Sequence, residues 1–265
     1  MILSIVLGAL VGIIMGLTGA GGGILAVPLL VFGLGLSVAQ AGPIGLMAVG
    51  IAAAMGAAMG LRAKVVRYRA ALLIAGVGML VAPLGAWLAQ RVDTRFLSLV
   101  FALVLLWVAY KTFRESAAHG TKPGSPGRAT PPCIRDAEDG RFIWTSKCAG
   151  ALSLSGSLAG ALSGLLGVGG GFVMVPALQR YTDLAMQSVV ATSLAVIALI
   201  SLAGVVTSIS AGHFNLAVGL PFSAGALAGM AAGSMLSSRL PTRYLKIAFA
   251  GICVVVAAGM IAKSL

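Results

Sequence analysis

The sequence predicts an all-α polytopic membrane protein built from two homologous four-segment repeats. Of its 265 residues, 59% are hydrophobic and only 9% are charged, whereas ordinary soluble domains carry about 25% charged residues. Apolar runs of about 20 residues, the length that crosses a bilayer, recur along the chain. The second half of the chain also repeats the pattern of the first half.

The apolar runs form two groups of four, separated by a polar stretch. We expect a first membrane repeat over 1–114, a linker over 115–147 and a second membrane repeat over 148–265. The linker is rich in Pro, Gly, Ser and charged residues, which is typical of a flexible extramembrane connection. The predicted membrane segments are 2–34, 38–61, 70–90, 95–114, 148–182, 186–209, 215–237 and 243–263.

The repeat is clearest in a glycine-rich motif. Residues 16–30 return 148 positions later as residues 164–178, with nine of the fifteen positions identical. Each copy carries five glycines in a fixed pattern and then a proline, Pro28 or Pro176. Duplication around interrupted hydrophobic segments points to the binding site of a transporter.

The glycines also decide the topology. As one helix, segment 2–34 would be about 50 Å long, but the hydrocarbon core is about 30 Å thick. Each glycine destabilises a helix by about 1 kcal/mol relative to alanine, so we expect a break at residues 19–23. The broken segment can still cross the bilayer, giving eight crossings and parallel repeats. Alternatively it can turn back at the glycines, giving three crossings per repeat and inverted repeats.

The positive charges favour the inverted arrangement. Lysines and arginines divide 12 to 6 between the two sides in the parallel arrangement and 15 to 3 in the inverted one. Because basic residues concentrate in cytoplasmic loops, the second division is the cleaner one. Both arrangements place the linker in the cytoplasm.

The two glycine motifs form the candidate substrate site. A run of glycines can turn several backbone N–H groups into one concavity. The helix that follows carries about +0.5 charge at its N-terminus, so the motif can bind an anion without a buried Lys or Arg. By contrast, Gly56-xxx-Gly60 and Gly225-xxx-Gly229 predict close helix packing. The candidate anion ligands are Gly19, Gly21, Gly22, Gly23, Gly167, Gly169, Gly170 and Gly171.

The doubled motif Gly-x-x-Gly-x-Gly-Gly-Gly-x-x-x-x-Pro resembles the sulfite exporter TauE/SafE family of anion transporters. In that family, a helix commonly beginning with Ala-x-x-Thr-Ser follows each copy. Thr192 and Ser193 match this pair, whereas the first repeat has Ile44 and Gly45. The resemblance covers the chain outside the linker. It implies transport of sulfite or an organosulfur anion such as a sulfonate across a bacterial inner membrane, with Thr192 and Ser193 as candidate ligands.

Two glutamines near the starts of predicted segments, Gln40 and Gln187, are further candidate ligands. Each could reach the anion or simply cap its helix. The expected partners are the lipid bilayer and a small anion, and a homo-oligomer is possible.

Acidic residues bear on the direction of transport. All six lie in predicted loops or in the linker, so none stands in mid-membrane, where proton relays lie. Moving one negative charge outward down an inside-negative potential gains about 2.3 kcal/mol per 100 mV. Export therefore needs no coupling ion, and we expect export.

Other classes are disfavoured. The net charge of +12 comes from short clusters without interleaved aromatic residues, so we expect it to orient the protein rather than to bind nucleic acid. The cysteines show no metal-binding spacing, and Cys133 and Cys148 are expected to be free thiols. No cofactor is expected. An intramembrane serine enzyme would pair Ser163 with a histidine, but the histidines are His119 in the linker and His213 at a turn. A glycine-lined anion channel, or a carrier for an unrelated small substrate, is the nearer alternative.

Overall fold

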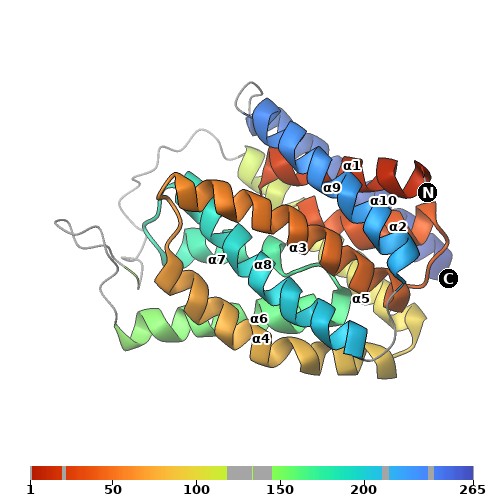
Figure 1. Ribbon diagram of the computed structural model, residues 1–265, viewed down its shortest axis with the longest axis horizontal. Helices are drawn as coiled ribbons and strands as arrows, with labels where there is room; N and C mark the ends of the chain where they lie inside the picture. Colours follow the sequence, from red (N-terminus) through yellow and green to blue (C-terminus); the bar gives the residue numbers. More distant parts are fainter. Residues whose placement is uncertain are drawn as a thin grey trace.

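A computed structural model describes residues 2–19, 22–117, 133, 145–210, 215–237 and 242–264. These residues are almost entirely helical (Figure 1). Six of the described helices are long and apolar enough to cross a membrane. The predicted polytopic all-α class is therefore confirmed. The helices are α1 (Ile2–Thr18), the 3-10 helix η1 (Gly22–Leu25), α2 (Ala26–Gly33), α3 (Val38–Arg62), α4 (Tyr68–Arg91), α5 (Thr94–Ala117), α6 (Ser146–Leu166), α7 (Gly171–Tyr181), α8 (Met186–Ser210), α9 (Leu216–Ser237) and α10 (Thr242–Ser264).

Residues that favour a helix boundary stand at the ends of α3 and α4. Ser37 caps α3 by accepting a hydrogen bond from the Gln40 backbone N–H (3.3 Å), and the Gln40 side chain accepts one from the Ser37 N–H (3.2 Å). This capping box satisfies two N–H groups that lack partners within the helix. At the other end, Arg62 and Arg91 close α3 and α4, where a cation interacts favourably with the helix dipole.

The chain reverses direction at the first glycine motif. A Cβ added to Gly22 would meet the Met15 backbone, and a Cβ added to Gly33 would meet the Leu7 side chain. The later residue of the returning segment thus contacts the earlier residue of α1, so α2 runs antiparallel to α1. The expected break at residues 19–23 is present, and the broken segment forms a helical hairpin.

The second motif makes the same reversal. A Cβ on Gly170 would lie 2.6 Å from the Ala159 carbonyl oxygen, in the middle of α6. The α6–α7 pair is therefore a second helical hairpin, and α7 begins beside the middle of its partner helix.

The largest interfaces join one repeat to the other. Helix α1 packs against α9, and the equivalent helices of the other repeat, α6 and α4, pack in the same way. The equivalent helices α3 and α8 pack against each other, as do α5 and α10. Each of these helix pairs thus joins helices that correspond to each other, or to another such pair, under the 148-residue offset of the sequence.

Glycines permit the close approach of these helices. A Cβ on Gly229 would meet the Ala9 carbonyl group of α1, and one on Gly12 would meet the Ala226 carbonyl group of α9. A Cβ on Gly56 would lie 2.8 Å from Leu194 Cδ1 of α8, and one on Gly60 would lie 2.8 Å from Ala191 Cβ. The predicted packing role of these small-residue spacings is confirmed.

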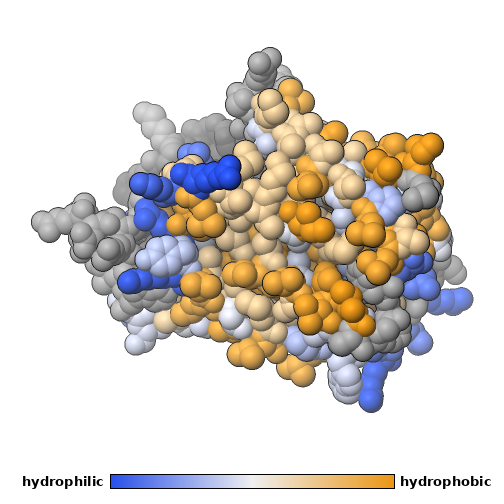
Figure 2. Space-filling view, viewed as in Figure 1, coloured by the Kyte–Doolittle hydropathy of each residue, from blue (hydrophilic) through white to orange (hydrophobic). Residues whose placement is uncertain are grey.

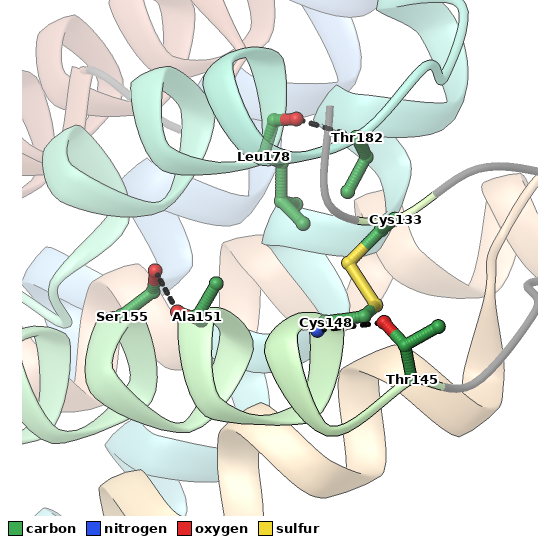
Figure 3. Close-up of a disulfide and its surroundings, with 7 residues drawn as sticks. All are labelled: Cys133, Thr145, Cys148, Ala151, Ser155, Leu178 and Thr182. Carbon is green, nitrogen blue, oxygen red and sulfur yellow. Dashed lines mark hydrogen bonds between the residues drawn. A yellow bond between two sulfur atoms is a disulfide. The ribbon is translucent and has the colours of Figure 1, made fainter. Parts of the chain in front are cut away.

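The prediction of free thiols at Cys133 and Cys148 is wrong, because the structure joins them in a disulfide (Figure 3). The Cys133 N–H also donates to the Tyr181 carbonyl oxygen (3.1 Å) at the end of α7. The Cys148 N–H donates to Thr145 Oγ1 (3.1 Å) at the start of α6. The return of α7 along α6 creates this meeting point, which a spacing of 15 residues in the sequence did not reveal. Apart from Cys133, residues 118–144 of the predicted linker (115–147) lie outside the described part of the chain.

The surface has an apolar middle and two polar ends (Figure 2). We call the end where α3 ends and α6 begins the linker face, and the end where α1 begins and α10 ends the terminal face (Figure 1). Arg91 lies over the exposed Trp87 ring (4.3 Å to its centroid), and Lys111 lies over the exposed Trp107 ring (5.2 Å). Exposed aromatic rings paired with cations are typical of membrane–water interfaces.

Candidate functional site

The two glycine motifs meet in the interior of the protein. A Cβ on Gly23 would lie 3.5 Å from the Val168 carbonyl oxygen, which belongs to the second motif. The Cβ on Gly23 would also lie 2.9 Å from Val49 Cγ1. A Cβ on Gly169 would lie 3.4 Å from the same Val49 atom and 2.9 Å from Ile197 Cγ2. Val49 and Ile197 are equivalent residues of α3 and α8. The motifs therefore meet beside α3 and α8.

Positive φ angles shape the motif backbone. Gly19, Gly167, Gly169 and Gly170 have φ values of +77°, +70°, +75° and +68°, in a region that costs residues with a Cβ about 1 kcal/mol or more. Gly167 ends α6 by donating its N–H to the Ser163 carbonyl oxygen (2.9 Å). These angles allow the chain to leave one helix and enter the next within a few buried residues.

Two helices begin at this meeting point. In the first repeat, η1 starts at Gly22 and leads into α2; in the second, α7 starts at Gly171 after Gly170 as its N-cap. Neither α2 nor α7 has a side-chain cap at its N-terminus. The first N–H groups of such helices lack partners within the helix and carry partial positive charge. The described candidate ligand glycines are all buried: Gly19, Gly22, Gly23, Gly167, Gly169, Gly170 and Gly171. Gly16 and Gly164, which open the two motifs, are half-buried, and Gly21 lies outside the described residues.

The Thr-Ser pair on α8 is divided between two roles. Thr192 Oγ1 accepts a hydrogen bond from the Arg67 backbone N–H (3.1 Å), so its hydroxyl anchors the start of α4. Ser193 Oγ is buried and has no hydrogen-bond partner within the described part of the chain. One turn earlier on α8, Val190 packs on Gly19, since a Cβ there would lie 2.7 Å from Val190 Cγ1. The pair thus lies two and three residues after a residue of α8 that contacts the first glycine motif.

The two glutamines occupy helix starts. Gln40 is exposed and forms the capping box of α3 with Ser37. Gln187 is exposed at the second residue of α8. Both glutamines are therefore exposed, whereas the candidate ligand glycines are buried. Gln40 caps α3, and Gln187 lies at the surface.

Ser201 is a candidate that sequence reasoning missed. Its side chain is 1% exposed, and its hydroxyl has no hydrogen-bond partner among the described residues. A Cβ added to Gly169 would lie 3.0 Å from Ser201 Oγ, so the hydroxyl lies directly against the second glycine motif. A buried polar group without a partner costs free energy and calls for a ligand or water. The repeat comparison could have found it, because the equivalent residue of α3 is Ala53.

We expect Ser201→Ala to weaken oxyanion binding without destabilising the protein. A hydrogen bond to a charged group contributes about 1.5–3 kcal/mol, so the dissociation constant should rise about tenfold or more. The unfolding temperature should stay unchanged or rise, because the variant removes an unpartnered buried hydroxyl.

Ser155→Ala is the matched control, because Ser155 is also buried but donates to the Ala151 carbonyl oxygen within α6 (2.8 Å). Titration of both purified variants with sulfite provides the measurement. Equal affinities of the two variants would exclude Ser201 as a ligand.

The chain is similar in sequence to proteins named as probable membrane transporters. Residues 4–260 match the model of the family described as sulfite exporter TauE/SafE. A probable membrane transporter protein of Xylella fastidiosa (strain 9a5c) is 31% identical over 244 residues, covering 90% of this chain and 85% of the relative. A Bacillus subtilis (strain 168) protein named probable membrane transporter protein YunE is 24% identical over 257 residues, covering 92% of this chain and 91% of the relative. No solved structure matches the chain. The chain, a multi-pass membrane protein, belongs to the sulfite exporter TauE/SafE family.

Proposed function

We propose that the protein is a secondary transporter of small oxyanions, namely sulfite or organosulfur anions such as sulfonates. The observation that carries the proposal is the meeting of two glycine motifs and two uncapped helix starts at the buried centre. The buried, unpartnered hydroxyl of Ser201 beside Gly169 supports it independently. Backbone N–H groups at helix starts bind anions, and hydroxyl groups add hydrogen bonds that fix the oxygen atoms.

We propose an inverted-repeat topology with six crossings, formed by α3, α4, α5, α8, α9 and α10. The α1–α2 hairpin enters from the terminal face and the α6–α7 hairpin from the linker face, and each returns to the face it entered from. Helix α6 is long enough to cross by itself, but α7 brings the chain back to Cys133 and Cys148. Inverted repeats around a central site are the common architecture for alternating access.

We propose that the linker face is cytoplasmic and that the membrane is the bacterial inner membrane. In this topology 15 basic residues lie at the linker face and 3 at the terminal face, which is the positive-inside distribution. The disulfide favours the opposite orientation, because cytosolic proteins rarely keep disulfides. The charges have more weight, since they are spread over several loops.

A single cysteine decides the orientation. Leu36 lies in the short loop between α2 and α3, at the terminal face. In intact cells, Leu36→Cys should react with a membrane-impermeant maleimide, and the wild type should not, because its free Cys253 is buried. Labelling only after the cells are permeabilised would reverse the assigned orientation.

The direction we propose is export, driven by the membrane potential. In the described residues, Asp93 lies in the loop before α5 and Asp183 in the loop before α8, and Glu115 is in the last turn of α5. No described carboxylate therefore stands in mid-helix to carry a coupled proton. A negative charge moving outward gains about 2.3 kcal/mol per 100 mV.

Proteoliposomes loaded with sulfite test both the function and its driving force. We expect saturable efflux that accelerates when an inside-negative potassium diffusion potential is imposed at constant pH. Liposomes without protein control for leakage. Efflux that ignores the potential would contradict electrogenic export, and efflux that does not saturate with sulfite would indicate a channel.

A further inference from the structure

Arg67 carries a buried polar atom that the fold does not satisfy. It is the residue before α4, and its side chain is half-buried. Within the described part of the chain, its Nε is fully buried and has no hydrogen-bond partner. An unpaired N–H of a charged group is among the most costly groups to bury, so it points to a ligand.

The backbone of Arg67 is held in place by the second repeat. Its N–H donates to Thr192 Oγ1 of α8 over 3.1 Å, although the two residues are 125 positions apart in the sequence. On the same stretch of α8, Ala191 packs on Gly60 and Val190 packs on Gly19 of the first glycine motif. Arg67 therefore lies near the linker face, and its backbone contacts α8 two residues after Val190, which packs on the first motif.

Among the described residues, the equivalent position of the other repeat is built differently. With the 148-residue offset of the repeats, Asn215 corresponds to Arg67 and Ile44 corresponds to Thr192. Asn215 is exposed, and its Oδ1 accepts the Ala217 N–H (3.1 Å), as a helix cap does. At this position of the repeat, a guanidinium group stands at the linker face and a neutral amide stands at the terminal face.

We propose that Arg67 forms an entry site for oxyanions at the linker face, from which the anion passes to the glycine motifs. Nε–H and a terminal N–H of a guanidinium group form a fork that binds two oxygen atoms of one anion. Sulfite and sulfonates offer such oxygen pairs. The inference rests on the proposed oxyanion transport and adds a second, one-sided binding step to it.

The test compares Arg67→Gln with Arg69→Gln in membrane vesicles that expose the linker face. Arg69 is an exposed neighbour on α4, so its replacement makes the same change in charge without touching the buried site. For sulfite added at the linker face, the half-saturating concentration should rise about tenfold in Arg67→Gln and stay within about twofold in Arg69→Gln. Arg67→Lys keeps the positive charge but loses the forked guanidinium group, so it should also raise the half-saturating concentration at the linker face.

Sidedness separates binding from folding. A variant with damaged structure would lose maximal flux from both faces, whereas loss of an entry site raises the half-saturating concentration at the linker face alone. An unchanged half-saturating sulfite concentration in Arg67→Gln would overturn the entry site while leaving oxyanion transport intact. An equal rise of this concentration in Arg67→Gln and Arg69→Gln would do the same. Absence of saturable sulfite flux in the wild type would overturn the proposed function, and the entry site with it.

Discussion

Gly229→Leu is expected to abolish stable folding of the protein. A Cβ at this position would meet the Ala9 carbonyl group and lie 2.9 Å from Ile13 N, so it collides with the backbone of α1. Backbone in a packed helix cannot rotate away as a side chain can, and the helices would have to separate. Overpacking in a core costs about 1–3 kcal/mol even when side chains can adjust. Here we expect a loss at or above about 4 kcal/mol, which is exceptional for one substitution.

Gly251→Leu is the control for this prediction. Gly251 is exposed on α10, and a Cβ there would have no neighbour within 4 Å. Both variants add the same apolar side chain to a glycine within a long helix. We expect Gly251→Leu to unfold close to wild type in a denaturant titration of the detergent-solubilised protein. Similar midpoints for the two variants would contradict the close α1–α9 interface.

Gly23→Ala is expected to abolish or strongly reduce sulfite transport. The added methyl group would project between the two motifs, 3.5 Å from the Val168 carbonyl oxygen and 2.9 Å from Val49 Cγ1. Gly23 does not have positive φ, so alanine introduces bulk without the backbone strain it would cause at Gly169. We expect at least a tenfold loss, which corresponds to about 1.4 kcal/mol of binding free energy.

A double variant separates the site from its packing. Val49→Ala removes the side chain that the new methyl group would meet. Gly23→Ala/Val49→Ala should therefore regain the stability lost in Gly23→Ala, yet its transport should stay low because the methyl group still occupies the space of the anion. Val49→Ala alone should retain transport. Recovery of transport in the double variant would show that Gly23 matters only for packing.

Gly22→Leu and Gly170→Leu should also abolish binding, but they test the hairpins as well. The new side chains would meet the backbone of their own hairpins, at Met15 and Ala159. Loss of binding in these variants would follow from misfolding or from a blocked site. Gly23 is the better position because its neighbour Val49 is a side chain.

Much of the fold follows from the sequence because bilayer-spanning helices are specified by long, local patterns. The predicted segment 38–61 became α3 (Val38–Arg62), and 186–209 became α8 (Met186–Ser210). Apolar length and the basic residues at helix ends define such boundaries without any knowledge of tertiary contacts. The break at residues 19–23 was predictable for the same reason, since consecutive glycines disfavour a helix locally.

Tertiary relations account for what the sequence could not show. The disulfide between Cys133 and Cys148 depends on the return of α7 along α6, and no local spacing encodes that return. Likewise, Thr192 looks like a ligand in the sequence, but its hydroxyl accepts the Arg67 N–H from another helix. Ser201 looks like an ordinary small residue of α8 until Gly169 is placed against it.

Equilibrium binding of sulfite to the purified protein tests the glycine-motif anion site most directly. Calorimetric titration should compare the wild type, Gly23→Ala/Val49→Ala and Gly76→Ala, in which the new methyl group on α4 would have no neighbour within 4 Å. We predict saturable binding by the wild type and by Gly76→Ala, and an affinity at least about tenfold weaker in the double variant. Equal affinity for sulfite in all three proteins would contradict an anion site between the two glycine motifs.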